Sequence, residues 1–116
     1  MLLLHVLGRA THDRAWLIAH DGDALPPGAA ARFDALCARR LRGEPVAYLT
    51  GTKAFHGLTL QVDARVLDPR DDTETLVDWA LDVLPTERPA RVLDLGTGSG
   101  AIALALAAAR THASVW

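Results

Sequence analysis

Hydrophobic residues recur at helical spacing over the first half of the chain, and Gly and Pro divide that half into three segments. The apolar run over residues 1–7 predicts a helix that ends at Gly8, because glycine adopts the left-handed conformation at a helix C-terminus without a steric cost. A second helix is expected from a cap at Thr11 to about His20. A third helix is predicted over residues 29–41. Its apolar residues fall at three- and four-residue intervals and so share one face: Ala30, Phe33, Leu36, Cys37 and Leu41.

The spacing changes near residue 50, where short apolar segments are separated by turn residues. Residues 53–55 and 58–62 flank the pair His56-Gly57, which predicts a β-hairpin with glycine at its turn. Strand alternation then places one set of side chains on a single apolar face: Leu58, Leu60 and Val62. A two-stranded unit is not stable alone in water, so this face needs a neighbour that covers it.

A further helix is predicted after the hairpin. It begins near Asp71, which stands three residues before Glu74 at the spacing of a capping box, and it ends at Pro85. The acidic start also suits the positive end of the helix dipole. Its apolar stripe consists of Leu76, Val77, Ala80, Leu81 and Leu84.

The last part of the chain predicts a strand, a helix and the start of a second strand. Residues 90–95 form a short apolar strand with little alternation, as expected of a parallel strand that is covered on both faces. Residues 101–109 predict a helix rich in alanine and leucine, and residues 113–116 predict the next strand. This arrangement is one incomplete βαβ unit, whose sheet edges need partners.

The composition is that of an ordinary globular protein, since half of the 116 residues are hydrophobic and 22% are charged. Twelve basic and fourteen acidic residues give a net charge of −2, which argues against a protein that binds nucleic acid mainly through its charge. The single cysteine, Cys37, excludes an internal disulfide and a thiolate metal cluster. The sequence starts without an export signal, and no apolar run approaches the roughly 20 residues needed to span a bilayer. We therefore expect a cytoplasmic protein without membrane contact.

A glycine-rich turn joins the strand over residues 90–95 to the helix that follows it. Gly96, Gly98 and Gly100 allow a tight backbone turn and leave amide groups uncovered at a helix N-terminus, which favours a nucleotide-like ligand. The spacing also fits the G-x-G-x-x-G/A pattern of dinucleotide-binding proteins, with Ala101 at the last position. That pattern alone is weak evidence.

Asp94, two residues before the turn, changes this interpretation. An acidic residue at the carboxyl end of the strand repels a pyrophosphate, but it attracts the amino group of a zwitterionic cofactor, directly or through water. Residues 94–100 resemble motif I of the class I methyltransferases, which bind S-adenosylmethionine. The resemblance implies a cofactor site made of Asp94, Gly96, Thr97, Gly98, Ser99 and Gly100. The alternative is a tight strand-to-helix turn whose aspartate is solvated or caps the helix.

Three upstream segments make the resemblance more specific. They are RRLRGEPVAYLTG at residues 39–51, FHGL at residues 55–58 and VLDPRDDTE at residues 66–74. Together with motif I, and in the same order, they resemble the HemK/PrmC family, the protein-(glutamine-N5) methyltransferases of peptide-chain release factors.

The family resemblance implies an α/β fold in three parts. A small helical domain for substrate recognition occupies residues 1–51, and a β-hairpin connector occupies residues 52–68. Residues 69–116 then begin a class I, Rossmann-like methyltransferase domain with its first βα unit. On this interpretation the chain is an N-terminal and middle fragment of such an enzyme.

The resemblance also implies the reaction and its partners. Members of the family transfer a methyl group from S-adenosylmethionine to the side-chain amide of the glutamine in the release factor's Gly-Gly-Gln motif. It implies that Arg70, Thr73 and Glu74 lie near the methionine end of the cofactor and the substrate glutamine. Asp68 and Asp71 depart from the family pattern, which has an apolar residue and a proline there. An alternative of equal weight is that this segment caps a helix while Arg70 pairs with a nearby carboxylate.

Catalytic groups are not expected within these residues. The family's catalytic Asn-Pro-Pro-Tyr loop has no counterpart here, because the sequence contains no asparagine. We therefore expect no methyl transfer and weak or no cofactor binding by the 116 residues alone. The histidines show no metal-ligand spacing, and a basic cluster is expected on a solvated face rather than on a release factor or ribosomal RNA. This cluster consists of Arg39, Arg40 and Arg42.

Two alternative functions are consistent with some of these sequence features. A class I methyltransferase that acts on adenine amino groups of nucleic acid would have the same cofactor loop, but the near-neutral charge and the segment at residues 45–51 argue against it. A docking module that binds a release factor without chemistry is the non-enzymatic alternative.

Overall fold

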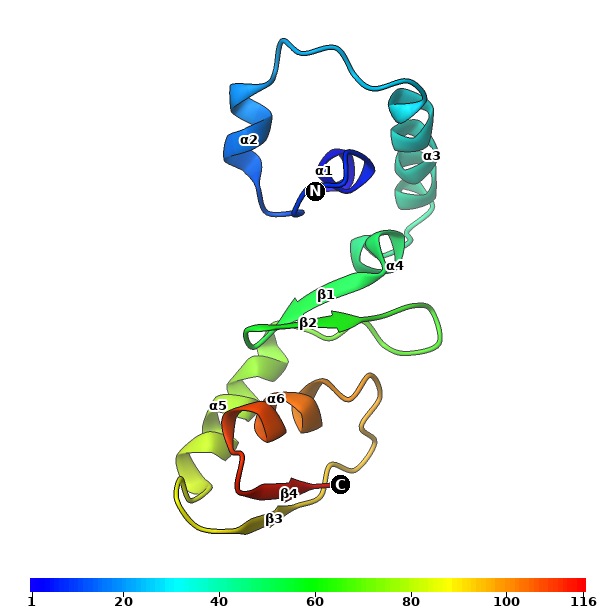
Figure 1. Cartoon of the computed structure of the whole chain (residues 1–116). Coiled ribbons are helices and arrows are strands. Elements are labelled where there is room, and N and C mark those ends of the chain that lie inside the picture. Colours follow the sequence, from blue (N-terminus) through cyan, green and yellow to red (C-terminus); the bar gives the residue numbers. More distant parts are fainter. The chain divides into compact units, whose positions relative to one another are not determined.

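A computed structural model describes residues 1–116, which form two compact units, Met1–Thr50 and Gly51–Trp116. The first unit is entirely helical, and the second contains both helices and strands (Figure 1). No helix in the chain combines the length and the apolar character that crossing a membrane requires.

The first unit consists of four helices. They are α1 (Leu2–Val6), α2 (Arg14–Ala19), α3 (Ala29–Leu41) and α4 (Val46–Thr50). Leu4 of α1 is fully buried where this helix contacts α3 and α4. Ala29, Ala47 and Leu49 complete the buried core of the unit. The helix predicted over residues 29–41 is confirmed with the same bounds.

Several predictions for the first unit were wrong in detail. Asp13 rather than Thr11 caps α2, since the backbone N–H of Trp16 donates to Asp13 Oδ1 at 3.2 Å. Leu41, expected on the apolar face of α3, is the last residue of this helix and is 88% exposed. Ala30 is exposed as well. Helix α4 was not predicted, because five residues are too few to show helical periodicity.

The predicted β-hairpin is confirmed in the second unit. Strand β1 (Thr52–Phe55) pairs antiparallel with β2 (Leu58–Gln61), and Phe55 lies opposite Leu58. The two turn residues both have positive φ, +45° at His56 and +77° at Gly57. This is the type I′ geometry whose twist matches that of the flanking strands. One face of the hairpin is buried, through Phe55, Leu60 and Val62.

Helix α5 (Asp72–Val83) follows the hairpin and contacts α6 (Ala101–Ala109). Val77 of α5 is fully buried, and Ala105 and Leu106 of α6 are at most 2% exposed. Figure 1 shows the two helices side by side, with a pair of short strands next to α6.

These strands are β3 (Ala90–Val92) and β4 (Ala113–Val115), which pair in parallel with Val92 opposite Val115. Helix α6 connects them, so the predicted strand–helix–strand unit is confirmed as a βαβ arrangement. Because parallel neighbours need a crossover connection, the turn before α6 lies at the carboxyl end of β3. The chain therefore has a mixed α/β fold.

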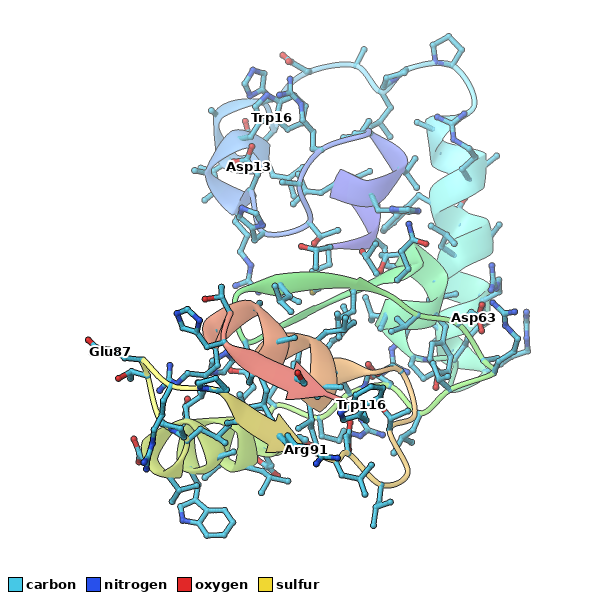
Figure 2. All side chains as sticks on the ribbon, turned by 60° about the horizontal axis from the view of Figure 1, so that its bottom comes forward. Asp13, Trp16, Asp63, Glu87, Arg91 and Trp116 are labelled. Atoms are coloured by element: carbon cyan, nitrogen blue, oxygen red, sulfur yellow. The ribbon has the colours of Figure 1, made fainter.

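The prediction for the first of these strands was wrong in two respects. Strand β3 ends at Val92 rather than at residue 95, and it is not covered on both faces. Leu93 is 67% exposed and Leu95 is 83% exposed, because no element covers them. Figure 2 shows Arg91 on β3 and Trp116 just beyond β4, and these residues line an open cavity with Val92 and Leu93.

Candidate functional site

The glycine loop, residues 96–100, connects β3 to α6 through a backbone that only glycine adopts readily. Gly96, Gly98 and Gly100 have φ values of +77°, +56° and +77°. Nothing lies within 4 Å of a Cβ built on Gly96, so the backbone conformation rather than lack of space requires glycine there. The loop is closed by the N–H of Gly100, which donates to the carbonyl of Thr97 at 2.8 Å.

The start of α6 is open to a ligand. Gly100 is its N-cap, and no side chain accepts a hydrogen bond from the first turn. The first N–H groups of a helix have no partner within the helix, and the helix dipole is positive there. Thr97 is exposed and Ser99 is half-buried, and neither side chain caps the helix. The loop therefore offers backbone donors that a polar ligand can use.

Asp94 lies immediately before this loop with a carboxylate that is partly unsatisfied. Its backbone N–H donates to the carbonyl of Trp116 at 2.8 Å, which continues the pairing beyond Val92. Its Oδ2 atom is buried and has no hydrogen-bond partner. A buried acceptor without a donor costs about 1–3 kcal/mol, and more when it is charged. Asp94 therefore fits a ligand with an N–H donor, and an ammonium group would satisfy both the hydrogen bond and the charge.

A cavity of about 320 Å³ lies on the glycine loop. Gly98 and Ser99 form one side, and the segment from the end of β2 onward forms the other. That segment contributes Gln61, Asp63, Arg65 and Val66. Gln61, Asp63 and Arg65 were not predicted as site residues, because no periodicity links these two parts of the chain. Opposite charges two residues apart at the end of an apolar strand were the only available signal. Figure 2 shows Asp63 on the loop after β2.

Asp63 and Arg65 form a tight ion pair at this cavity. The backbone N–H of Arg65 donates to Asp63 Oδ1 at 3.0 Å, and Arg65 Nε contacts both carboxylate oxygens at 2.9 and 3.0 Å. Arg65 Nη2 also donates to Oδ2. The side-chain and backbone hydrogen bonds from Arg65 lower the pKa of Asp63 to about 2. The same contact raises the pKa of Arg65.

Arg70 lies near a carboxylate, as one of the two predictions for this segment expected, and its place near the cofactor stays a prediction. The Arg70 side chain is 66% exposed, and its Nη1 lies 3.8 Å from Oδ2 of Asp68. Asp68 is buried, and its Oδ1 has no hydrogen-bond partner. The N–H of Thr73 donates to the carbonyl of Arg70 at 3.0 Å. No hydrogen bond or ion pair joins Arg70, Thr73 or Glu74 to the glycine loop.

Acidic residues at the start of α5 and along it contact the hairpin. Glu74 Oε1 accepts the backbone N–H of His56 at 2.8 Å, and His56 Nε2 lies 3.0 Å from Asp78 Oδ1. Lys53 Nζ donates to Asp71 Oδ1 at 2.7 Å, a contact that lowers the pKa of Asp71. The predicted capping box was wrong, because Asp71 has a helical backbone and its side chain makes no cap bond.

The first unit has a cavity of its own, about 700 Å³ in volume, between α1, α2 and the loop after α2. Trp16 lines it, with the Arg9 guanidinium 4.4 Å from the Trp16 ring and His20 stacked on that ring at 4.3 Å. Of the arginine cluster at the end of α3, Arg39 is engaged by Glu44, with Nε donating to Oε2 at 2.8 Å. This hydrogen bond lowers the pKa of Glu44.

Comparison with known proteins identifies the class to which the first unit belongs. Residues 1–51 match the family model of the PrmC N-terminal domain. This match and the relatives below confirm the resemblance to the HemK/PrmC family that the sequence motifs predicted.

The similarity to individual relatives extends over nearly the whole chain. The release factor glutamine methyltransferase of Bordetella pertussis is 51% identical over 99% of the chain and 42% of its own length. Proteins of the same name from Xylella fastidiosa and Escherichia coli are 50% and 48% identical, over 98% and 99% of the chain and 40% of their own lengths. The chain thus spans about two fifths of the length of these relatives.

The contact between Glu74 and the hairpin turn predicts a stability effect. Glu74→Ala should lower the free energy of unfolding by about 1–2 kcal/mol, because the His56 amide loses its acceptor. Glu74→Gln retains an acceptor oxygen and should lose less. Glu87→Ala, in the exposed segment between α5 and β3 (Figure 2), is the matched control and should stay within about 0.5 kcal/mol of the parent. Urea unfolding measures these differences, and equal losses at Glu74 and Glu87 would contradict the assignment.

The Asp63–Arg65 pair predicts a titration in the acid range. Because the folded pKa of Asp63 is about 2, below its ordinary value of 3.8, the pair's contribution to stability is complete above pH 4 and is lost as the pH falls through 2. The carboxyl ¹³C shift of Asp63 should therefore titrate near pH 2. In Arg65→Ala the midpoint should rise toward 3.8, whereas Arg91→Ala should leave it in place. A midpoint near 4 in the unaltered protein would refute the pairing.

Proposed function

We propose that the complete polypeptide containing these residues methylates the glutamine side-chain amide in the Gly-Gly-Gln motif of peptide-chain release factors, using S-adenosylmethionine. The name release factor glutamine methyltransferase, which relatives 48–51% identical to the chain carry, supports this. The single observation that carries it is the buried, unpartnered Oδ2 of Asp94 beside a loop of three positive-φ glycines. That combination suits a ligand with a positive amino end.

In the proposed site, Asp94 and the glycine loop hold the cofactor. Asp94 accepts from its ammonium group, while backbone N–H groups of the loop meet its polar atoms without side chains in the way. The further contact residues are Gly96, Thr97, Gly98, Ser99 and Gly100. When bound, S-adenosylmethionine supplies an electrophilic methyl group on its sulfonium. Residues outside this chain must align and polarise the glutamine amide, which is a poor nucleophile because its lone pair is delocalised.

Each of the three predicted parts has its own proposed role. We assign release-factor recognition to the helical residues 1–51, which match the PrmC N-terminal domain. The hairpin over residues 52–68 connects it to a class I, Rossmann-like methyltransferase domain that begins at residue 69. The contacts of Lys53 and His56 with α5 support a fixed connector. Further strands of the complete domain would then pair with the β3–β4 sheet and cover its exposed leucines.

The proposed reaction is tested by methyl transfer from labelled S-adenosylmethionine. The complete polypeptide should label a release factor at the Gly-Gly-Gln glutamine, as located by mass spectrometry, and should not label DNA. A polypeptide of residues 1–116 should label neither, because it contains no asparagine for the amide-binding loop. Incorporation into DNA with none into the release factor would replace the proposal by an adenine methyltransferase.

Cofactor recognition is tested separately by binding. In the complete polypeptide, Asp94→Asn should weaken S-adenosylmethionine binding about 10- to 100-fold, because a hydrogen bond to a charged group contributes roughly 1.5–3 kcal/mol. Asp72→Asn, at the exposed start of α5, is the control and should bind as the parent does. Isothermal titration calorimetry gives both constants. Unchanged affinity of Asp94→Asn would remove the main support for the proposal.

A further inference from the structure

The cavity on the glycine loop has a basic group that lies outside the glycine motif. Gly98 and Ser99 lie on one side of it, and Arg65 lies on the other, on the segment after β2. The Arg65 side chain is 88% exposed, so a ligand in the cavity can reach it without displacing core residues. A cationic side chain thus faces the same space as the loop.

The ion pair with Asp63 leaves part of the Arg65 guanidinium unused. Asp63 accepts from Nε and Nη2, so the two N–H groups of Nη1 remain for another acceptor. The backbone N–H of Arg65 also binds Asp63, which fixes the base of the side chain. Guanidinium groups bind carboxylates well because their planar set of donors matches the two oxygens. Arg65 is therefore held at the cavity with donors available.

The charges around the loop determine which kind of charged ligand can bind there. Asp63 offsets the charge of Arg65, so the carboxylate beside the loop that lacks a partner is that of Asp94. A diphosphate brings at least two negative charges and would meet this carboxylate, which is unfavourable. An α-amino acid carries one ammonium and one carboxylate, and Asp94 and Arg65 supply one group of the opposite sign for each. The site is thus complementary to a zwitterion.

We propose that Arg65 binds the carboxylate of the ligand that lies on the glycine loop. Asp94 and Arg65 then recognise the ammonium and the carboxylate group of its amino-acid part. This inference rests on the proposed function and adds to it a binding residue outside the glycine motif. Asp63 holds Arg65 in place through the contacts described above.

The test compares two probes that share a thioether-bearing adenosine. S-adenosylhomocysteine has the amino-acid end, and 5′-methylthioadenosine lacks it. In the complete polypeptide, Arg65→Ala should weaken S-adenosylhomocysteine binding about 10-fold by calorimetry and leave methylthioadenosine binding unchanged. Arg65→Lys, which keeps the charge, should retain part of the affinity. Arg91→Ala removes an exposed arginine that lies outside this cavity and should bind both probes as the parent does.

The outcomes separate this inference from the proposed function. If Arg65→Ala binds S-adenosylhomocysteine as tightly as the parent while Asp94→Asn does not, Arg65 is not a ligand residue and the cofactor site stands. Equal weakening for both probes also overturns the inference, because it shows that the substitution acts on the nucleoside end or on folding. Failure of the parent protein to bind S-adenosylhomocysteine overturns the proposed function together with it.

Discussion

The parallel pairing of β3 with β4 is the constraint on which the candidate site depends. Two parallel neighbours cannot be joined by a tight turn, so the chain must leave β3 at its carboxyl end and return through α6. The pairing continues to the backbone of Asp94, which donates to Trp116. That contact fixes Asp94 at the end of the ladder with one carboxylate oxygen buried, and the glycine loop follows directly.

Carboxylates of the second unit differ in whether their oxygens have partners. Asp71, Glu74 and Asp78, at the start of α5 and along it, contact the hairpin. Asp68 and Asp94 each have a buried oxygen without a hydrogen-bond partner. A satisfied carboxylate holds elements together, whereas a buried and unsatisfied one still lacks a donor. Of these two, Asp94 stands two residues before the glycine loop, which favours a ligand role for it and a structural role for Glu74.

Local patterns in the sequence predicted most of the fold. Helix α3 has apolar residues at helical spacing, and α6 is rich in alanine and leucine. His56-Gly57 between two apolar segments predicts the hairpin turn. The glycine spacing and Asp94 likewise predict the motif part of the site. The cap at Asp13 was missed because Thr11 and Asp13 are both good caps, so residue type alone does not decide between them. The Asp63–Arg65 pair was missed because only folding brings it to the glycine loop.

The central claim is that a carboxylate beside this loop receives the ammonium group of an amino-acid cofactor. A crystal structure of the complete polypeptide with S-adenosylhomocysteine tests it most directly. We predict that the ligand's ammonium nitrogen lies within hydrogen-bond distance of Asp94 Oδ2, with its nucleoside beyond residues 96–100. A structure in which a dinucleotide binds instead, with its diphosphate along those residues, would contradict it.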